Sequence, residues 1–374
     1  MDLGFQMWDG DNHLYEAIDA FTRHLPAERQ RSCYWSTNDR GHRHLVIDGR
    51  VWDFIPNPTF DPVAVPGALD RRRVEPLADH PEYQNRDARL RRFDEQGIEA
   101  SLMFPTLASG LEEVVGENIS LHSDLLWSYN RWLAEEWGFD YRGRIFGTPL
   151  FSLSQPEEAT RMLDWALEQG TRAIMLASGS VLTSEGRRSP GDPMFDGFWA
   201  RCAEAGTLVC AHISANGYNR YSGDYTGHYM FRPFEDHTVD RILNDGRAIA
   251  DFFTVMVWHG ALTRHRGLRL MSVENGSQWV APLLARFRRF ARPGLLDEDP
   301  IDTFQRAVLV TPHWEDPIEE LVAAISAETI VAGSDWPHYD ALSNPTDFAK
   351  YLAGLPAGDI RRIMRENLRS ALAA

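Results

Sequence analysis

The sequence contains little cysteine. Cys33, Cys202 and Cys210 are the only cysteines in 374 residues, and they are too widely spaced for a disulfide framework or a Cys-x-x-Cys metal site. This scarcity favours a reducing, cytoplasmic location. The sequence also lacks a run of about 18 apolar residues, so we expect no membrane span. Because no basic segment followed by an apolar one opens the chain, we expect no signal peptide.

Positive charge is scarce as well. The chain has 38 basic and 54 acidic residues and a net charge of −16. This balance argues against nucleic acid or an anionic membrane surface as a partner. The rest of the composition, 43% hydrophobic and 25% charged, is ordinary for a globular protein. A small molecule is therefore the expected partner.

Apolar runs alternate with amphipathic segments along the chain. The runs predict eight strands, at 5–8, 98–105, 144–150, 171–176, 207–211, 268–273, 306–310 and 329–332. The segments between them predict helices at 14–21, 86–96, 125–137, 157–169, 193–204, 237–262, 278–290 and 317–325, with closing helices at 347–352 and 359–373. Such alternation is typical of a parallel α/β fold. Eight repeats predict a (β/α)8 TIM barrel, formed by the single domain 1–374.

Residues 25–80 do not fit this alternation. They contain Asp48-Gly49 between apolar residues, which is a strong signal for a β-hairpin, followed by several prolines. A barrel needs about 250 residues, so the chain has room for an insertion. We expect 25–80 to form an inserted hairpin and loop cap. His42 and His44 form a His-x-His pair there, but they open a hairpin rather than end a buried strand, so we expect no metal site at this pair.

Side chains that can bind a metal stand at the ends of four predicted strands. Asp11 and His13 follow the first strand two residues apart, and alternate residues of an extended chain point to one face. His212 ends the fifth strand, Glu274 the sixth and Asp335 the eighth. A lone Asp or His after a strand is more often structural, and Asp11 or Asn12 could cap a helix. Together, at the barrel face where chemistry takes place, they predict a divalent metal site, with Zn favoured and Mn or Fe as alternatives.

The segment 215–236, after the fifth strand, is polar and aromatic, and we expect a long loop over the site. Arg220 and Arg232 lie in this loop and could hold a substrate carboxylate. Either one alone could equally be a surface charge. Twelve tryptophans is a high count, and we expect some of them in a pocket or an interface. Trp336, next to Asp335, is the candidate substrate contact.

These motifs resemble those of the metal-dependent amidohydrolase superfamily, in particular its amidohydrolase-2 branch. That branch contains aminocarboxymuconate-semialdehyde decarboxylase, resorcylate and carboxyvanillate decarboxylases and several lactone hydrolases. The resemblance covers most of the chain outside 25–80. It rests on four stretches: Asp11-Asn12-His13, 192–199 leading to Ala211-His212, 264–270, and 333–338.

The resemblance implies a site as well as a fold. It implies metal ligands at Asp11, His13, His212 and Asp335, and a homodimer. It implies one metal rather than two, because the predicted fourth strand holds no lysine. The sixth strand departs from the pattern, since characterised decarboxylases of this branch look to have a His where this chain has Glu274. Glu274 could be a further ligand, a general acid or base, or a site for a cationic substrate group.

Three functions follow as hypotheses. The leading one is a mononuclear metal hydrolase, in which Asp335 deprotonates a metal-bound water that attacks an amide, ester or lactone carbonyl. Glu274 and His338 are further catalytic candidates, although His338 could merely cap its turn. The alternative is a non-oxidative decarboxylase of an aromatic or unsaturated acid, supported by the Asp-x-His start and the two loop arginines. The third is a barrel without metal that acts as a binding or structural protein.

Overall fold

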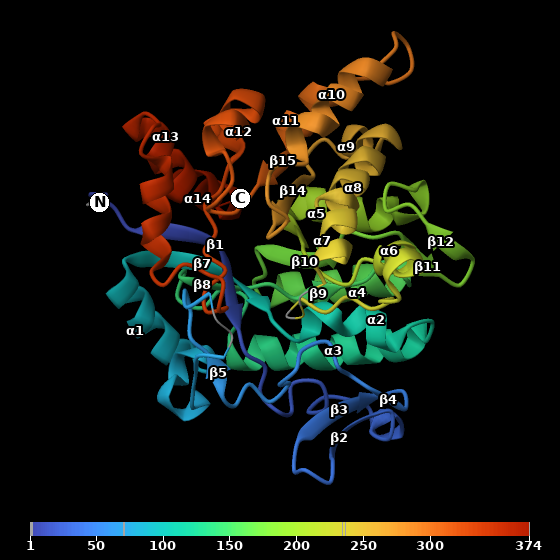
Figure 1. The fold of residues 1–374 in the computed structure, drawn as a ribbon. Helices are drawn as coiled ribbons and strands as arrows, with labels where there is room; N and C mark the ends of the chain where they lie inside the picture. The colour runs from blue at the N-terminus through green and yellow to red at the C-terminus, as the bar shows by residue number, and fades with distance from the viewer. Residues whose placement is uncertain (1–2, 70–71, 234, 236, 374) are drawn as a thin grey trace.

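Parallel strands form the centre of the molecule (Figure 1). The computed structural model describes residues 3–69, 72–233, 235 and 237–373. One sheet contains β1 (Met7–Leu14), β7 (Ile98–Pro105) and β8 (Ile145–Gly147), in that order. A second sheet has the order β15 (Val308–Val310), β14 (Arg269–Val273), β13 (Leu208–His212), β10 (Ala173–Ala177) and β9 (Leu150–Phe151). Every pair within these two sheets is parallel, which confirms the predicted α/β class.

The two sheets adjoin along the chain. Only Thr148 and Pro149 separate β8 from β9. On the other side, the segment 330–336 makes isolated parallel bridges to both sheets, Ile330 with Val310 and Trp336 with Asn12. The predicted strand at 329–332 is therefore present as bridges rather than as a regular strand. The ladder breaks because the next turn donates two backbone N–H groups, from residues 334 and 335, to one carbonyl oxygen of β1.

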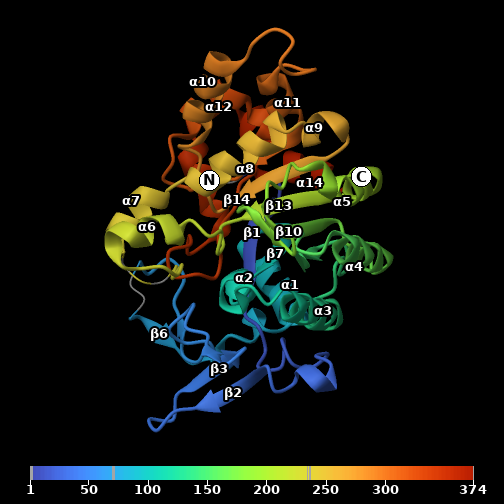
Figure 2. The same cartoon turned by 90° about the vertical axis from the view of Figure 1, so that its right-hand side faces the viewer.

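Helices surround these strands (Figures 1 and 2). They are α1 (Arg86–Gln96), α2 (Leu111–Val115), α3 (Ile119–Glu136), α4 (Pro156–Glu168), α5 (Asp196–Ala205), α6 (Asn219–Thr226), α7 (Thr238–Asn244), α8 (Arg247–Trp258), α9 (Ala261–Arg264), α10 (Val280–Phe290), α11 (Pro300–Ala307), α12 (Ile318–Ile325), α13 (Ala357–Arg361) and α14 (Asn367–Leu372). The prediction for 86–96 is confirmed at both ends, because Asn85 caps its N-terminus and Gly97 takes the left-handed conformation after its C-terminus.

The helix predicted at 14–21 is wrong. β1 instead continues through Leu14, which pairs with Pro105 of β7, and residues 18–24 form turns. All eight residues of β1 are buried, so the apolar residues that suggested a helix belong to a central strand and to the turn after it. The longer strand carries Asp11 and His13 inside β1 rather than after it.

Other segments also differ from the prediction. The strand at 144–150 is divided into β8 and β9, which belong to different sheets. The helix at 237–262 is divided into α7, α8 and α9, because Gly246 and Gly260 adopt positive φ angles of 60° and 76° between them. The loop at 215–236 contains α6. The strand at 306–310 is shorter than predicted, because α11 extends to Ala307.

The described residues of 25–80 contain antiparallel strands. β2 (Cys33–Thr37), β3 (Arg43–Ile47) and β4 (Arg50–Val51) make a small sheet, and β5 (Val63–Ala64) pairs with β6 (Val74–Glu75). Asp48 and Gly49 join β3 to β4 with φ angles of 50° and 76°, as a two-residue turn of this kind requires. The predicted hairpin is thus confirmed. Figures 1 and 2 both show the β2–β3–β4 sheet below the parallel strands and separate from them.

The central strands lie in the apolar core. Every residue of β1, β13 and β15 is buried. An outer hairpin of β11 (Val181–Thr183) and β12 (Gly186–Arg188) follows β10. Within the described parts of the chain, no helix has the length and apolar character needed to cross a membrane.

Candidate metal centre

Asp11, His13 and His212 converge at the carboxyl ends of β1 and β13. The Nε2 atoms of the two histidines are 3.3 Å apart. Asp11 Oδ1 lies 3.3 Å from His13 Nε2 and 3.5 Å from His212 Nε2. These side chains are only 2–3% exposed. The predicted grouping of these three residues is therefore present as a compact, buried cluster.

Hydrogen bonds orient both imidazoles toward one point. His13 Nδ1 is 3.0 Å from the carbonyl oxygen of Pro105, and His212 Nδ1 is 2.8 Å from that of Ile213. Because a carbonyl can only accept, each Nδ1 carries the proton and donates, which leaves each Nε2 as an inward lone pair. Two facing lone pairs cannot bond to each other. Asp11 Oδ1 is also buried without a hydrogen-bond partner.

A divalent cation satisfies all three inward atoms at once. Two nitrogen ligands 2.0–2.1 Å from a tetrahedral metal are about 3.3 Å apart, which matches the separation of the two Nε2 atoms. Burial, together with the charge of His338, lowers the pKa of His13 to about 3, so this imidazole is neutral, as a ligand must be. The residues present therefore fit a metal.

Glu274 and Asp335 stand beside this cluster. Glu274 Oε2 lies 3.4 Å from His212 Nε2, and Asp335 Oδ1 lies 3.3 Å from His13 Nε2. Their side chains are 23% and 17% exposed, more than those of the three buried residues. Both residues adopt positive φ angles, 55° and 57°, which non-glycine residues rarely adopt and which occur at functional sites. This conformation ends each strand and directs its carboxylate into the site.

The carboxylates crowd one another. Burial, and then the charge of Asp335, raises the pKa of Glu274 well above its ordinary value. Burial, and then the charge of Asp11, does the same for Asp335. Three acidic side chains therefore face one another beside two imidazoles. A bound cation would offset this repulsion, so metal binding is expected to displace protons from the site.

A chain of hydrogen bonds runs from Asp335 through His338 to Thr106. Its Nδ1 lies 2.6 Å from Asp335 Oδ1, and its Nε2 lies 3.1 Å from Thr106 Oγ1. The Thr106 hydroxyl donates its own proton to the carbonyl oxygen of Leu14, at 2.9 Å, so it accepts from His338 Nε2. One proton is consequently held between Asp335 and His338 Nδ1. This arrangement suits transfer of a proton to or from the site.

Two buried residues that the sequence analysis missed form hydrogen bonds to the segments that carry the candidate ligands. Asp9 is fully buried, and its carboxylate accepts the backbone N–H of Ser334 at 3.0 Å and the Ser334 hydroxyl at 2.6 Å. Burial raises the pKa of Asp9 to about 7. Arg89 is also fully buried, and it donates to the carbonyl oxygen of His13 at 2.8 Å and to the side chain of Asn12. Asp9 stands two residues before Asp11, so the period of two in β1 was a signal that could have found it.

Gly333 provides a test of how tightly this turn is packed. A Cβ at this position would lie 2.6 Å from Asp11 Cβ and 2.5 Å from Thr311 Cγ2. We expect Gly333→Ala to displace Asp11 and to weaken metal binding by at least about tenfold, because overpacking of this size costs about 1–3 kcal/mol. Gly358→Ala is the matched control, since its Cβ would meet nothing within 4 Å. Metal titration of both variants measures the difference, and equal affinities would show that the turn has room.

The cluster of Asp11, His13 and His212 opens into a cavity of about 580 Å³. Arg232 lines this cavity, but its guanidinium is paired with Asp53 and Glu235. Segment 230–233 of the predicted loop lines it as well, as do Glu274, Asp335 and His338. The structure therefore brings the predicted metal-binding and catalytic residues together in one cavity.

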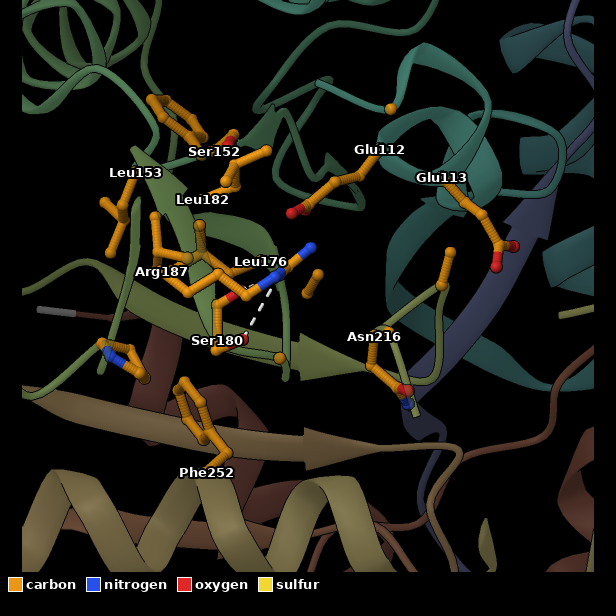
Figure 3. Close-up of a pocket in the computed structure, with 18 of the residues that line it drawn as sticks. Glu112, Glu113, Ser152, Leu153, Leu176, Ser180, Leu182, Arg187, Asn216 and Phe252 are labelled. Atoms are coloured by element: carbon orange, nitrogen blue, oxygen red, sulfur yellow. Dashed lines mark hydrogen bonds between the residues drawn. The ribbon is translucent and has the colours of Figure 1, made fainter. Parts of the chain in front are cut away.

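Two predicted substrate contacts lie elsewhere. Arg220 lines a neighbouring pocket of about 50 Å³. Figure 3 shows Glu112 and Arg187 in this pocket, with Arg187 hydrogen-bonded to Ser180. Trp336 is 1% exposed and does not line the large cavity. Its ring packs against the guanidinium of Arg89 at 4.6 Å, because the positive φ of Asp335 turns the following side chain toward the core.

Comparisons with known proteins agree with this geometry. The sequence profile described as Amidohydrolase matches residues 11–369. An amidohydrolase from Mycobacterium avium subsp. paratuberculosis K-10 is 38% identical over 99% of this chain and 98% of that one, and the structures superpose with a TM-score of 0.93. No curated protein matches the chain by sequence.

More distant solved structures share the fold. A dihydroxybenzoic acid decarboxylase from Polaromonas sp. JS666, with bound manganese and the inhibitor 2-nitroresorcinol, is 13% identical over 98% of this chain and 97% of that one, with a TM-score of 0.65. A 2,6-dihydroxybenzoate decarboxylase from Rhizobium is 17% identical over 83% of this chain and 96% of that one, with a TM-score of 0.62.

Proposed function

Because the chain belongs to the amidohydrolase family, we propose that it is a metal-dependent hydrolase of an amide, ester or lactone. The observation that carries this proposal is the convergence of three ligand atoms, Asp11 Oδ1 and the Nε2 atoms of His13 and His212, of which the Asp11 oxygen is buried without a hydrogen-bond partner. Three protein ligands with an open position are typical of a catalytic rather than a structural zinc site. Zinc is the metal we favour, and manganese or iron suits the same ligands.

The three most buried residues, Asp11, His13 and His212, would hold the metal. A divalent metal bound there supplies a water of lowered pKa and polarises the substrate carbonyl. Once metal binding has displaced the proton that Asp335 shares with His338, the Asp335 carboxylate would take the proton of the attacking water. The protonated carboxyl would then donate to His338 Nδ1. The same pair then returns the proton to the leaving group. Glu274, whose Oε2 lies 3.4 Å from His212 Nε2, would orient the water or the leaving group.

We also infer that the strands close into an eight-stranded barrel. The bridges of segment 330–336 to Val310 and Asn12 support closure between β15 and β1. Continuity of β8 and β9 along the chain supports it on the other side. We infer in addition that the insert at 25–80 acts as a cap, since Phe54 lines the large cavity and Asp53 is paired with Arg232 of the segment over the site.

A decarboxylase is the alternative function, because solved structures that share this fold include decarboxylases and one of them contains manganese. The charge of the cavity argues against it. Eight carboxylates and two guanidiniums line the cavity, which disfavours an anionic substrate. The two arginines predicted to bind a substrate carboxylate are also not free in this cavity. Arg220 lines the smaller pocket, and Arg232 forms ion pairs with Asp53 and Glu235.

A substrate panel tests the proposal. Protein loaded with zinc or manganese is incubated with esters, lactones and amides, and separately with hydroxybenzoates. We expect hydrolysis that a chelator abolishes and that added metal restores. Release of carbon dioxide from the hydroxybenzoates, without hydrolysis of any carbonyl substrate, would overturn the proposal in favour of the decarboxylase.

A further inference from the structure

We propose that the substrate of this hydrolase carries an uncharged apolar group larger than one aromatic ring, which packs against Phe54, Phe231 and Ile242 of the large cavity. This inference rests on the proposed function, because it places the reacting carbonyl at the metal centre. It goes further by naming the class of the non-reacting part of the substrate. Three features of the cavity support it: its apolar wall, its charge and its size.

The wall comes from separate elements. Phe54 belongs to the insert, Phe231 to the segment before α7, Ile242 to α7 and Trp314 to the segment after β15. Ile242 is 73% exposed, and an isoleucine so exposed on the lining of a cavity gains free energy when a ligand covers it. The ring centroids of Phe54 and Phe231 lie 6.0 Å apart. Phe54 is only 4% exposed, so Phe231 presents most of this aromatic surface to the cavity.

Ion pairs and hydrogen bonds fix this wall in place. The backbone N–H of Phe231 donates to the carboxylate of Glu113 at 3.0 Å. The next residue, Arg232, pairs with Asp53, which adjoins Phe54 in the insert. The two phenylalanines are thus attached to each other through neighbouring polar side chains. Because these contacts already order the wall, little conformational entropy is lost there when a ligand binds.

Charge and size define the ligand class further. Two guanidiniums against eight carboxylates give the lining an excess of negative charge, so an anionic tail is disfavoured. A cavity of about 580 Å³ lies in the range that encloses a ligand of drug size, which extends well beyond a single ring. An uncharged group of two rings, or an acyl chain of similar size, meets both conditions.

Hydroxamates provide the probe, since the hydroxamate group chelates a metal whatever its tail. Acetohydroxamate, benzohydroxamate and biphenyl-4-carbohydroxamate are titrated calorimetrically into metal-loaded protein. The second ring adds about 100 Å² of apolar surface, and burial of half of it corresponds to about tenfold in affinity. We expect the biphenyl compound to bind at least about tenfold more tightly than benzohydroxamate.

Matched variants locate the effect. Phe231→Ala is expected to remove most of the advantage of the second ring and to leave acetohydroxamate binding and metal content unchanged. Phe290→Ala, at an exposed phenylalanine of α10 outside the cavity, is expected to keep the full advantage. Equal or weaker binding of the biphenyl compound would overturn the inference while leaving the metal site intact. Failure of all three compounds to bind would overturn the open metal position itself, and the inference with it.

Discussion

Replacement of Asp335 by asparagine is expected to lower kcat/KM about 10³-fold while the protein keeps its metal. A positioned general base contributes about 10²–10⁴-fold to the rate, and asparagine cannot accept the proton. The metal should remain, because the proposed ligands are the buried residues Asp11, His13 and His212, and because asparagine preserves the shape of the replaced side chain. Steady-state kinetics on a substrate from the hydrolase panel, combined with metal analysis, measures both effects.

Asp340→Asn is the control for this prediction. Asp340 lines the same cavity and is exposed, but it contacts neither imidazole of the metal cluster. We expect this variant to retain kcat/KM within a few-fold. If Asp335→Asn were as active as Asp340→Asn, Asp335 would not be the base. Loss of metal from Asp335→Asn would instead make Asp335 a ligand, as the family resemblance implied.

The sequence was informative about the site wherever position along a strand sets direction. Asp11 and His13 share a face because a strand has a period of two, and His212 ends a continuously apolar run. Both predictions follow from local geometry. The same reasoning identified Glu274 and Asp335 at strand ends, and it predicted the Asp48-Gly49 turn, where two positive φ angles suit those residues.

Predictions failed where contacts between distant segments decide the outcome. The helix expected at 14–21 has an amphipathic pattern, but Leu14 pairs with Pro105 and belongs to β1, and residues 18–21 form turns. Trp336 follows a residue with positive φ, and the reversed backbone turns its ring toward Arg89. The hydrogen bonds of Asp9 and Arg89 could not be predicted either, because each joins segments that are far apart in the sequence.

Replacement of His212 by alanine is expected to remove the metal. The variant loses one of two imidazoles whose Nε2 atoms face each other 3.3 Å apart, and among the described residues the cluster that contains Asp11 and Glu274 has no third imidazole. Changes in groups that only support a ligand cost about 10–100-fold in metal affinity, so loss of a direct ligand should cost more than about 100-fold. His313→Ala is the control, since His313 lines the cavity outside the cluster.

The metal content of the purified protein tests the account most directly. Elemental analysis of the wild type, His212→Ala and His313→Ala, after incubation with zinc, manganese or iron and removal of free metal, compares the three proteins. The account predicts about one equivalent of metal in the wild type and in His313→Ala, and almost none in His212→Ala. A wild-type protein that holds no metal after such incubation would contradict it, as would a His212→Ala variant that holds as much as the wild type.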